Sequence, residues 1–160
     1  IITPRPPEAT DILQRRLFDD QYRVFHDPEC RAAPQTEADY LASDHVTVVH
    51  DAPRRTLDVD DWLLAQGLRR RVVASVPAFA GVAGFVRGGP WLVTAPGRLR
   101  DGVLRGLADA PVPVSAPLPP LAMFMVWHLR HQQDPLHRWL RQTLVEVAST
   151  VSAQPGRPQG

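Results

Sequence analysis

The chain has 160 residues, which is enough for one domain with its own hydrophobic core. Its hydrophobic fraction of 44% and charged fraction of 22% are those of a globular protein in water, and no apolar run is long enough to span a bilayer. A net charge of +1 gives no electrostatic reason to expect that this chain binds nucleic acid, and a single cysteine, Cys30, excludes an internal disulfide and fits a reducing compartment.

The first part of the chain predicts two strands and a short helix. Three prolines indicate an extended connection over residues 4–10, and alternating apolar and polar positions predict a strand over residues 17–26. Thr36 and Asp39 have the spacing of a helix N-cap and an acidic residue at the third helical position (N3), so a helix is expected to begin there. Residues 46–49 predict the next strand.

The centre of the chain predicts a buried strand that turns sharply into a helix. Before it, Asp58 is expected to cap a helix that Gly67 ends. Residues 72–76 (VVASV) are typical of a strand covered on both faces. Pro77 ends this strand, and apolar residues then recur at helical spacing over residues 79–86. In open α/β sheets, ligands bind at such carboxyl ends of strands.

The last part of the chain continues this alternation. A strand is expected over residues 91–94, and an apolar stripe predicts a helix over residues 99–107. Residues 112–116 are flanked by prolines and predict an edge strand. Residues 121–129 form the most continuous hydrophobic strand, and residues 153–160 are expected to be disordered.

The clearest predicted helix begins at Asp134, as N-cap, and Pro135, at the first helical position. One apolar face follows, with Leu136, Leu140, Leu144 and Val147 at helical spacing. Strands and helices thus alternate through the chain, which favours a mainly parallel α/β sheet.

The sequence offers no convincing catalytic or metal site. No G-x-S-x-G motif is present, Ser75 directly precedes Val76 and Pro77, and Cys30 is interpreted as a surface thiol. The six histidines, including the pair His128 and His131, have no partners at a familiar ligand spacing. We therefore expect no catalytic residue, no metal and no cofactor.

Several residues at element ends point instead to a binding site. His45 begins a strand, Pro77, Ala78 and Phe79 lead into a helix, and Arg98 follows a strand through a Pro-Gly turn, while Val126, Trp127 and His128 end the long hydrophobic strand. A guanidinium, a helix N-terminus, an imidazole and an aromatic wall would together suit a small anionic ring compound such as an aromatic carboxylate. The three arginines at residues 69–71 are interpreted as a solvated edge at a strand start.

The order of these segments resembles a known family. The chain is similar to the effector-binding domain of LysR-type transcriptional regulators, in particular the branch of nodulation regulators and of regulators that respond to salicylate and nitroaromatic compounds. The resemblance covers roughly residues 12–148. It rests on Leu17-Phe18-Asp19-Asp20; Asp39-Tyr40-Leu41-Ala42 with His45-Val46; Val76-Pro77 with Phe79-Ala80; Ala95-Pro96 with Arg98-Leu99; and Trp127-His128 with Asp134-Pro135 and Trp139-Leu140-Arg141.

The resemblance implies an α/β fold of the periplasmic-binding-protein type II class, with two Rossmann-like lobes. Residues 32–116 would form the complete second lobe, residues 1–31 a remnant of the first lobe with its first crossover strand, and residues 117–152 the second crossover and the last strand and helix of the first lobe. We expect the chain to be a fragment, with a winged helix-turn-helix and the opening half of the first lobe upstream of Ile1.

The resemblance also implies a function and the residues that carry it. His45 and Arg98 match polar inducer contacts, and Phe79 and Val126 match wall positions, whereas Ala78 stands where that branch often has a histidine. The expected protein is a cytoplasmic, non-enzymatic sensor that binds a small inducer between its lobes, forms dimers or tetramers when complete, and contacts DNA through the missing domain but no membrane. A periplasmic-type solute-binding protein, and an α/β hydrolase or transferase, remain alternatives.

Overall fold

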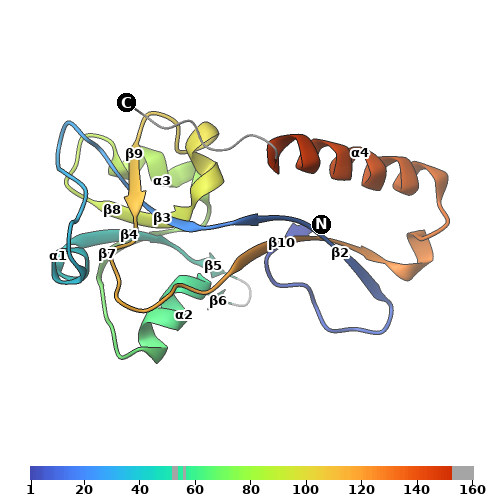
Figure 1. The fold of residues 1–160 in the computed structure, drawn as a ribbon, viewed down its shortest axis with the longest axis horizontal. Coiled ribbons are helices and arrows are strands. Elements are labelled where there is room, and N and C mark those ends of the chain that lie inside the picture. Colours follow the sequence, from blue (N-terminus) through green and yellow to red (C-terminus); the bar gives the residue numbers. More distant parts are fainter. Residues whose placement is uncertain (52–53, 56, 153–160) are drawn as a thin grey trace. The chain divides into compact units, whose positions relative to one another are not determined.

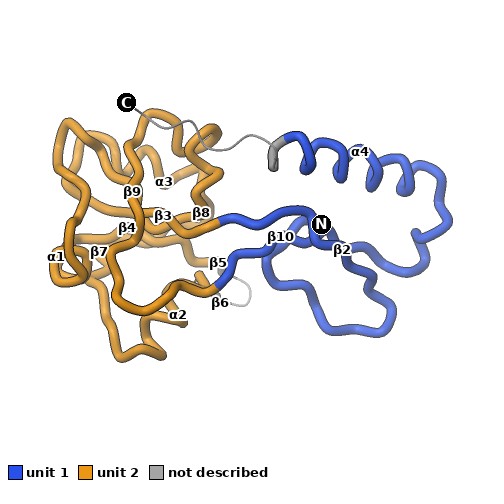
Figure 2. Tube along the Cα trace, viewed as in Figure 1, with its two compact units in different colours: residues 1–20, 120–160 blue, residues 21–119 orange. Residues whose placement is uncertain are grey.

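The computed structural model describes residues 1–51, 54–55 and 57–152. They form two compact units (Figure 2): unit 1 contains residues 1–20 together with 120–160, and unit 2 contains residues 21–119. The tail predicted to be disordered, residues 153–160, lies outside the described residues. The two units divide at residues 20/21 and 119/120, and the proposed lobe boundaries at residues 32 and 116 stay a prediction.

Unit 2 is built on a five-stranded sheet in the order β7–β4–β8–β3–β9 (Figure 1). Strand β4 runs parallel to β7 and β8, whereas β3 is antiparallel to both β8 and β9. The predicted parallel sheet is therefore present on the β7–β4–β8 side, and the sheet as a whole is mixed. The strands are β3 (Tyr22–His26), β4 (Asp44–Val48), β7 (Arg71–Val76), β8 (Leu92–Pro96) and β9 (Ala108–Pro111).

Two helices of unit 2 have the ends that their sequences predict, with one exception. Helix α1 (Glu37–Ala42) begins after Thr36, whose hydroxyl accepts a hydrogen bond of 3.1 Å from the backbone N–H of Asp39. Helix α2 (Asp58–Ala65) ends before Gly67, which has a φ of +73°. The prediction that Asp58 caps α2 is wrong, because Asp58 is already helical and Leu57 occupies the N-cap position.

Strand β7 and helix α3 (Phe79–Val86) form the predicted strand-to-helix turn, but the strand is not covered on both faces. Among the described strands, β7 pairs with β4 alone, so it lies at an edge of the sheet. Val72 and Val73 are accordingly 46% and 47% exposed, and only Val76 at the end of the strand is buried. The apolar run therefore marks an edge strand, which its composition alone could not distinguish from a central one.

Three other predicted elements differ from the structure. The strand expected over residues 17–26 is two strands, β2 (Ile12–Asp20) and β3, with Gln21 between them. The helix expected over residues 99–107 is a 3₁₀-helix, η1 (Gly97–Asp101), followed by turns, because Gly102 and Gly106 (φ +88°) interrupt the helical path. The expected edge strand lies earlier, at β9, since prolines after it cannot donate to a sheet.

The two faces of the unit 2 sheet differ in polarity. On one face, Val46 and Val48 of β4 pack with Phe25, with Val82 and Val86 of α3, and with Leu104 in an apolar core. On the other face, residues that alternate with these, His45 and Thr47 of β4 and Thr94 of β8, are buried and polar.

The short hairpin of β5 (His50–Asp51) and β6 (Arg54–Arg55) follows β4.

Unit 1 contains a three-stranded antiparallel sheet in the order β1–β10–β2 and one long helix. Strand β1 spans Ile2–Thr3, β10 spans Leu121–His128, and α4 spans Pro135–Ser152 after the short 3₁₀-helix η2 (Leu129–His131). The predicted cap of α4 is confirmed, because the Asp134 carboxylate accepts a hydrogen bond of 2.9 Å from the backbone N–H of His137.

The apolar face predicted for α4 is only partly buried. Helix α4 packs against β2 within unit 1 (Figure 1). Leu136, Leu140 and Val147 nevertheless stay exposed, and so does the neighbouring Trp139. None of the described helices is both long and apolar enough to cross a membrane.

Candidate functional site

The parallel strands of unit 2 bring two of the predicted site segments to the same end of the sheet, where the strands finish. The carboxyl ends of β7, β4 and β8 lie together there, because the three strands run in the same direction. Pro77, Ala78 and Phe79 follow β7, and Arg98 follows β8 in η1. The end of β4 lies between them, so the two segments are two strand spacings apart, about 10 Å.

The side chains at this edge differ in their surroundings. Pro77 and Ala78 are exposed, while Phe79 is half-buried and packs against the apolar core. Ala78 is the N-cap residue of α3 and makes no side-chain cap hydrogen bond, since a methyl group cannot accept one. Arg98 is half-buried. The Arg98 guanidinium and the first turn of α3 thus lie at the same end of the sheet.

His45 lies at the other end of the same strands. In the sheet it pairs with Val72 at the start of β7 and with Leu92 at the start of β8. Pro77 and Arg98 instead follow the last residues of those strands. The structure therefore does not bring His45 together with Pro77 and Arg98, and its role as an inducer contact stays a prediction.

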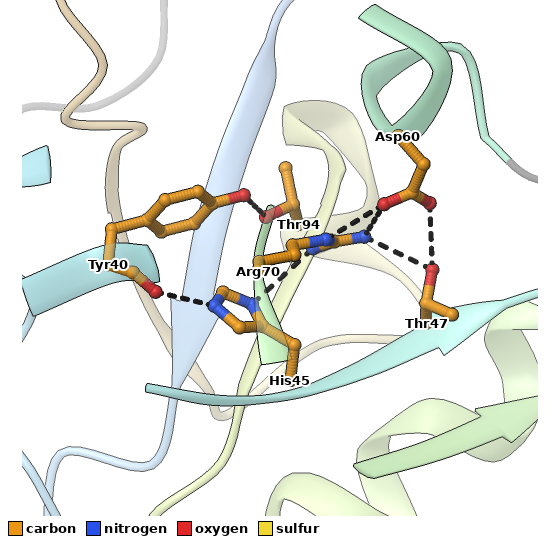
Figure 3. Close-up of polar contacts among 6 residues, drawn as sticks. All are labelled: Tyr40, His45, Thr47, Asp60, Arg70 and Thr94. Atoms are coloured by element: carbon orange, nitrogen blue, oxygen red, sulfur yellow. Dashed lines mark hydrogen bonds and ion pairs between the residues drawn. The ribbon is translucent and has the colours of Figure 1, made fainter. Parts of the chain in front are cut away.

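Instead, His45 belongs to a buried polar network on the helix α1 and α2 face of the sheet (Figure 3). Its Nε2 lies 2.7 Å from the carbonyl oxygen of Tyr40, and Arg70 Nη1 lies 3.4 Å from its Nδ1. Arg70 Nε donates to Asp60 Oδ1 at 2.8 Å, and Thr47 donates to Asp60 Oδ2 at 3.1 Å.

The tyrosine of α1 completes this polar network. The hydroxyl of Tyr40 lies 2.7 Å from that of Thr94 on β8, and the Tyr40 and His45 rings pack edge to face with their centroids 4.7 Å apart. The network fastens α1 and α2 to β4 and β8, because its members come from all four elements and from the segment just before β7.

The charge state of His45 follows from its neighbours. A carbonyl oxygen can only accept, so Nε2 carries the proton and Nδ1 is the acceptor for Arg70. Burial, and secondarily the cation of Arg70, lower the pKa of His45 to about 4. His45 is therefore neutral at pH 7, with both ring nitrogens engaged inside unit 2.

Sequence reasoning missed the buried ion pair of this network. The side chain of Arg70 is 3% exposed and that of Asp60 is 14% exposed. The interpretation of residues 69–71 as a solvated edge is wrong for Arg70, although Arg71 is 66% exposed and pairs with Asp44. The available signal was the alternation of His45 and Thr47 on one face of β4, which placed two polar groups where a partner was needed.

The remaining predicted residues, Val126 and Trp127, lie in unit 1. Val126 is buried, and the half-buried Trp127 donates from Nε1 to the side-chain oxygen of Gln132 at 2.8 Å. The guanidinium of Arg141 lies 4.9 Å from the centre of the Trp127 ring. Val126, Trp127 and Arg141 border a hollow of about 350 Å³ that is lined within unit 1 by apolar and basic side chains, among them Ile12, Leu140 and His131.

Nothing in the described part of the chain supports metal or thiol chemistry. No group of three or more histidine, cysteine, aspartate or glutamate residues there is arranged to hold a metal ion. Cys30 is exposed, and partial desolvation together with the nearby Asp27 raises the pKa of its thiol, which disfavours the reactive thiolate.

Comparison with known families gives one match over almost the whole chain. The family described as the LysR substrate binding domain matches residues 1–149. The HTH-type transcriptional activator NagR of Ralstonia sp is 32% identical over 148 residues, which cover 90% of this chain and 48% of NagR. Nodulation protein D 2 of Rhizobium tropici is 30% identical, with 84% of this chain and 44% of that protein covered.

Solved structures show the same fold. The regulatory domain of MexT, a transcriptional activator in Pseudomonas aeruginosa, has a TM-score of 0.72 and 22% identity, and the alignment covers 91% of this chain and 70% of that domain. Full-length CbnR in complex with its target DNA has a TM-score of 0.68 and 15% identity, with 92% of this chain and 52% of CbnR covered. The chain thus spans about half the length of the curated relatives that it matches.

Proposed function

The chain belongs to the LysR substrate-binding domain family, and from this premise we propose that it senses a small aromatic or carboxylate inducer in a cleft between its two lobes. Both the expected family and the expected α/β, periplasmic-binding-protein-like fold are confirmed. The relative NagR is an HTH-type transcriptional activator, which is consistent with the expected non-enzymatic role.

One observation carries the proposed ligand chemistry. Arg98 and the first turn of α3 lie at the same carboxyl edge of the parallel strands. A guanidinium binds a carboxylate through two parallel N–H donors, and the N–H groups at a helix start favour negative charge. The exposed Ala78 and half-buried Phe79 beside them offer apolar surface for a ring.

The buried network suggests a supporting role for His45 in this proposal. Since its two nitrogens bind Tyr40 and Arg70, we expect His45 to hold β4 and α1 in place rather than to touch the inducer. The end of β4, between Ala78 and Arg98, would then be a rigid floor of the site. A direct contact between His45 and the inducer would require this network to open.

The complete regulator would convert binding into a change on DNA. An inducer that binds one arrangement of the two lobes more tightly than another shifts the population towards that arrangement. We propose that the complete protein is a cytoplasmic dimer or tetramer that contacts its operator through a helix-turn-helix upstream of Ile1, and that this chain alone does not bind the operator.

The ligand proposal is tested by screening aromatic carboxylates for a thermal shift of the protein. We expect at least one compound to raise the melting temperature of the wild type, and Arg98→Ala to abolish that shift while the fold is retained. Arg105→Ala is the matched control, because Arg105 is an exposed arginine of the same unit. A hit that survives Arg98→Ala would remove Arg98 from the site.

A further inference from the structure

We propose that Arg23 and Arg100, held by Asp109, form a second binding site in unit 2, for the carboxylate group of a small molecule. Arg23 is on β3, Arg100 is on η1, and Asp109 is on β9. Nothing in the effector site proposed above uses these three side chains. The site goes beyond that proposal, although η1 also carries Arg98.

The geometry brings two cations onto one carboxylate oxygen. Arg23 Nε donates to Asp109 Oδ2 at 2.7 Å, and Arg100 Nη2 lies 3.3 Å from the same oxygen atom. The side chain of Asp109 is 11% exposed, whereas those of Arg23 and Arg100 are 24% and 37% exposed. The carboxylate is therefore enclosed, and the two guanidinium groups reach the surface around it.

The backbone holds this arrangement in place. Gly97 N–H donates to the carbonyl oxygen of Gln21 at 2.8 Å, and Arg100 Nε donates to the carbonyl oxygen of Gly97 at 3.0 Å. A Cβ atom at residue 97 would lie 2.9 Å from Arg23 Cγ, so any larger residue there would force the Arg23 side chain to shift. The arginines are thus positioned before any ligand arrives, which lowers the entropic cost of binding.

The charge balance of this arrangement favours an added anion. Two guanidinium groups share one carboxylate, so these three side chains carry a net charge of +1 in a partly desolvated place. Among the described residues, neither Nη1 nor Nη2 of Arg23 makes a hydrogen bond. A guanidinium group can bind a carboxylate through two parallel N–H donors such as these. A ligand carboxylate would satisfy these donors and offset the repulsion between the two cations.

Asp109 would act in this site as a built-in competitor. Its carboxylate occupies the guanidinium donors that face it, so the affinity for an outside anion is reduced while the arginines stay aligned. Neutralising Asp109 without changing its shape should therefore strengthen anion binding, although it weakens the fold. A purely structural ion-pair cluster would show only the loss of stability.

The test is a titration of the ¹⁵N-labelled chain with sodium acetate, monitored through the Nε–H signals of its arginines. Sodium chloride at equal ionic strength and neutral acetamide are the two references. We expect acetate alone to shift the signals of Arg23 and Arg100 in a saturable manner. Arg23→Gln and Arg100→Gln should each weaken acetate binding by tenfold or more, and Asp109→Asn should tighten it by threefold or more.

Two controls separate this site from the effector site and from general charge effects. Arg105→Gln, at an exposed arginine, and Arg98→Ala should both leave acetate binding at Arg23 and Arg100 unchanged. Equal shifts with acetate and chloride, or arginine variants that bind acetate like the wild type, would overturn the proposal. If Asp109→Asn fails to fold, the Arg23→Gln and Arg100→Gln titrations decide the question.

Discussion

At the level of single residues, His45 makes the stability of unit 2 depend on pH. The neutral ring donates to Tyr40 and accepts from Arg70, and burial holds the pKa of His45 near 4, against about 6.5 in the unfolded chain. Below pH 6.5 the unfolded chain therefore takes up a proton that the folded protein excludes. Stability from this group is complete above pH 6.5 and is lost as the pH falls towards 4.

We expect this loss to reach about 2 to 3 kcal/mol between pH 7 and pH 4. His26 adds to it in the same direction, because burial, and then the cation of Arg31, lower the pKa of that ring too. Urea unfolding from pH 8 to pH 4 measures the effect. His45→Gln keeps a donor and an acceptor but does not titrate, so its unfolding free energy should vary less with pH; an unchanged pH slope would contradict this account.

The buried ion pair marks the limit of what the sequence could predict at this scale. Arg70 stands between two other arginines, and in a sequence all three look equally solvated. Only the folded chain shows that the Arg70 side chain donates to Asp60, ten residues earlier, while the Arg71 side chain stays exposed. The partner of Arg70 depends on how α2 packs against the sheet, which hydrophobic periodicity does not encode.

At the level of elements, the helix ends at Thr36, Gly67 and Asp134 were predicted correctly, whereas the cap at Asp58 and some helix lengths were not. Thr36, Gly67 and Asp134 mark helix ends as expected, because a cap depends on residues within one turn. Residues 99–107 have an apolar stripe, yet the only helical turn there belongs to the short 3₁₀-helix η1. Gly102 and Gly106 lower the helical stability of this segment by more than its apolar residues raise it. Leu104 and Leu107 are buried all the same.

Two glycines of unit 2 provide a matched pair of substitutions at this scale. At both Gly67 and Gly81, an added Cβ would meet no atom within 4 Å, but Gly67 has a φ of +73° and Gly81 lies inside helix α3. Gly67→Ala should destabilise the protein by about 1 kcal/mol, because an L-residue is strained in the left-handed region. Gly81→Ala should stabilise it by about 0.5 to 1 kcal/mol through helix propensity.

Thermal or urea unfolding of the two glycine variants distinguishes conformation from space. If steric room alone governed these positions, both substitutions would have the same small effect. Opposite signs are expected only if the backbone angle at Gly67 is the one in the structure. Gly67→Asn is a useful third variant, since asparagine tolerates positive φ better than alanine and should recover part of the loss.

At the level of the whole molecule, the comparisons identify the fold where periodicity could only suggest a class. Alternating strands and helices predicted an α/β sheet, but the antiparallel β3 and β9 and the edge position of β7 depend on the family topology. The candidate site was predicted in part for the same reason. Pro77 and Arg98 follow the last residues of two strands that both run parallel to β4, whereas His45 lies near the first residue of β4 and so at the opposite end.

The two units should also differ in local stability. Unit 2 contains the apolar core of β4, β8 and α3 together with the Arg70–Asp60 network, whereas the buried apolar residues of unit 1 are Leu121, Met125, Val126 and Ala148 within the described ranges. Trp139 and Leu136 of α4 are 62% and 70% exposed. The opening of unit 1 therefore breaks fewer apolar contacts, and it should cost less free energy.

Amide hydrogen exchange tests this difference directly. The slowest amides should be those of β4, β8 and β3, with exchange free energies that approach the global unfolding free energy. Amides of α4 should exchange by local opening at a lower free energy. Trp139→Gln should change the exchange free energy of α4 little, because the Trp139 ring is mostly exposed. Equal protection in α4 and β4 would mean that a single cooperative transition includes both units, despite their separate cores.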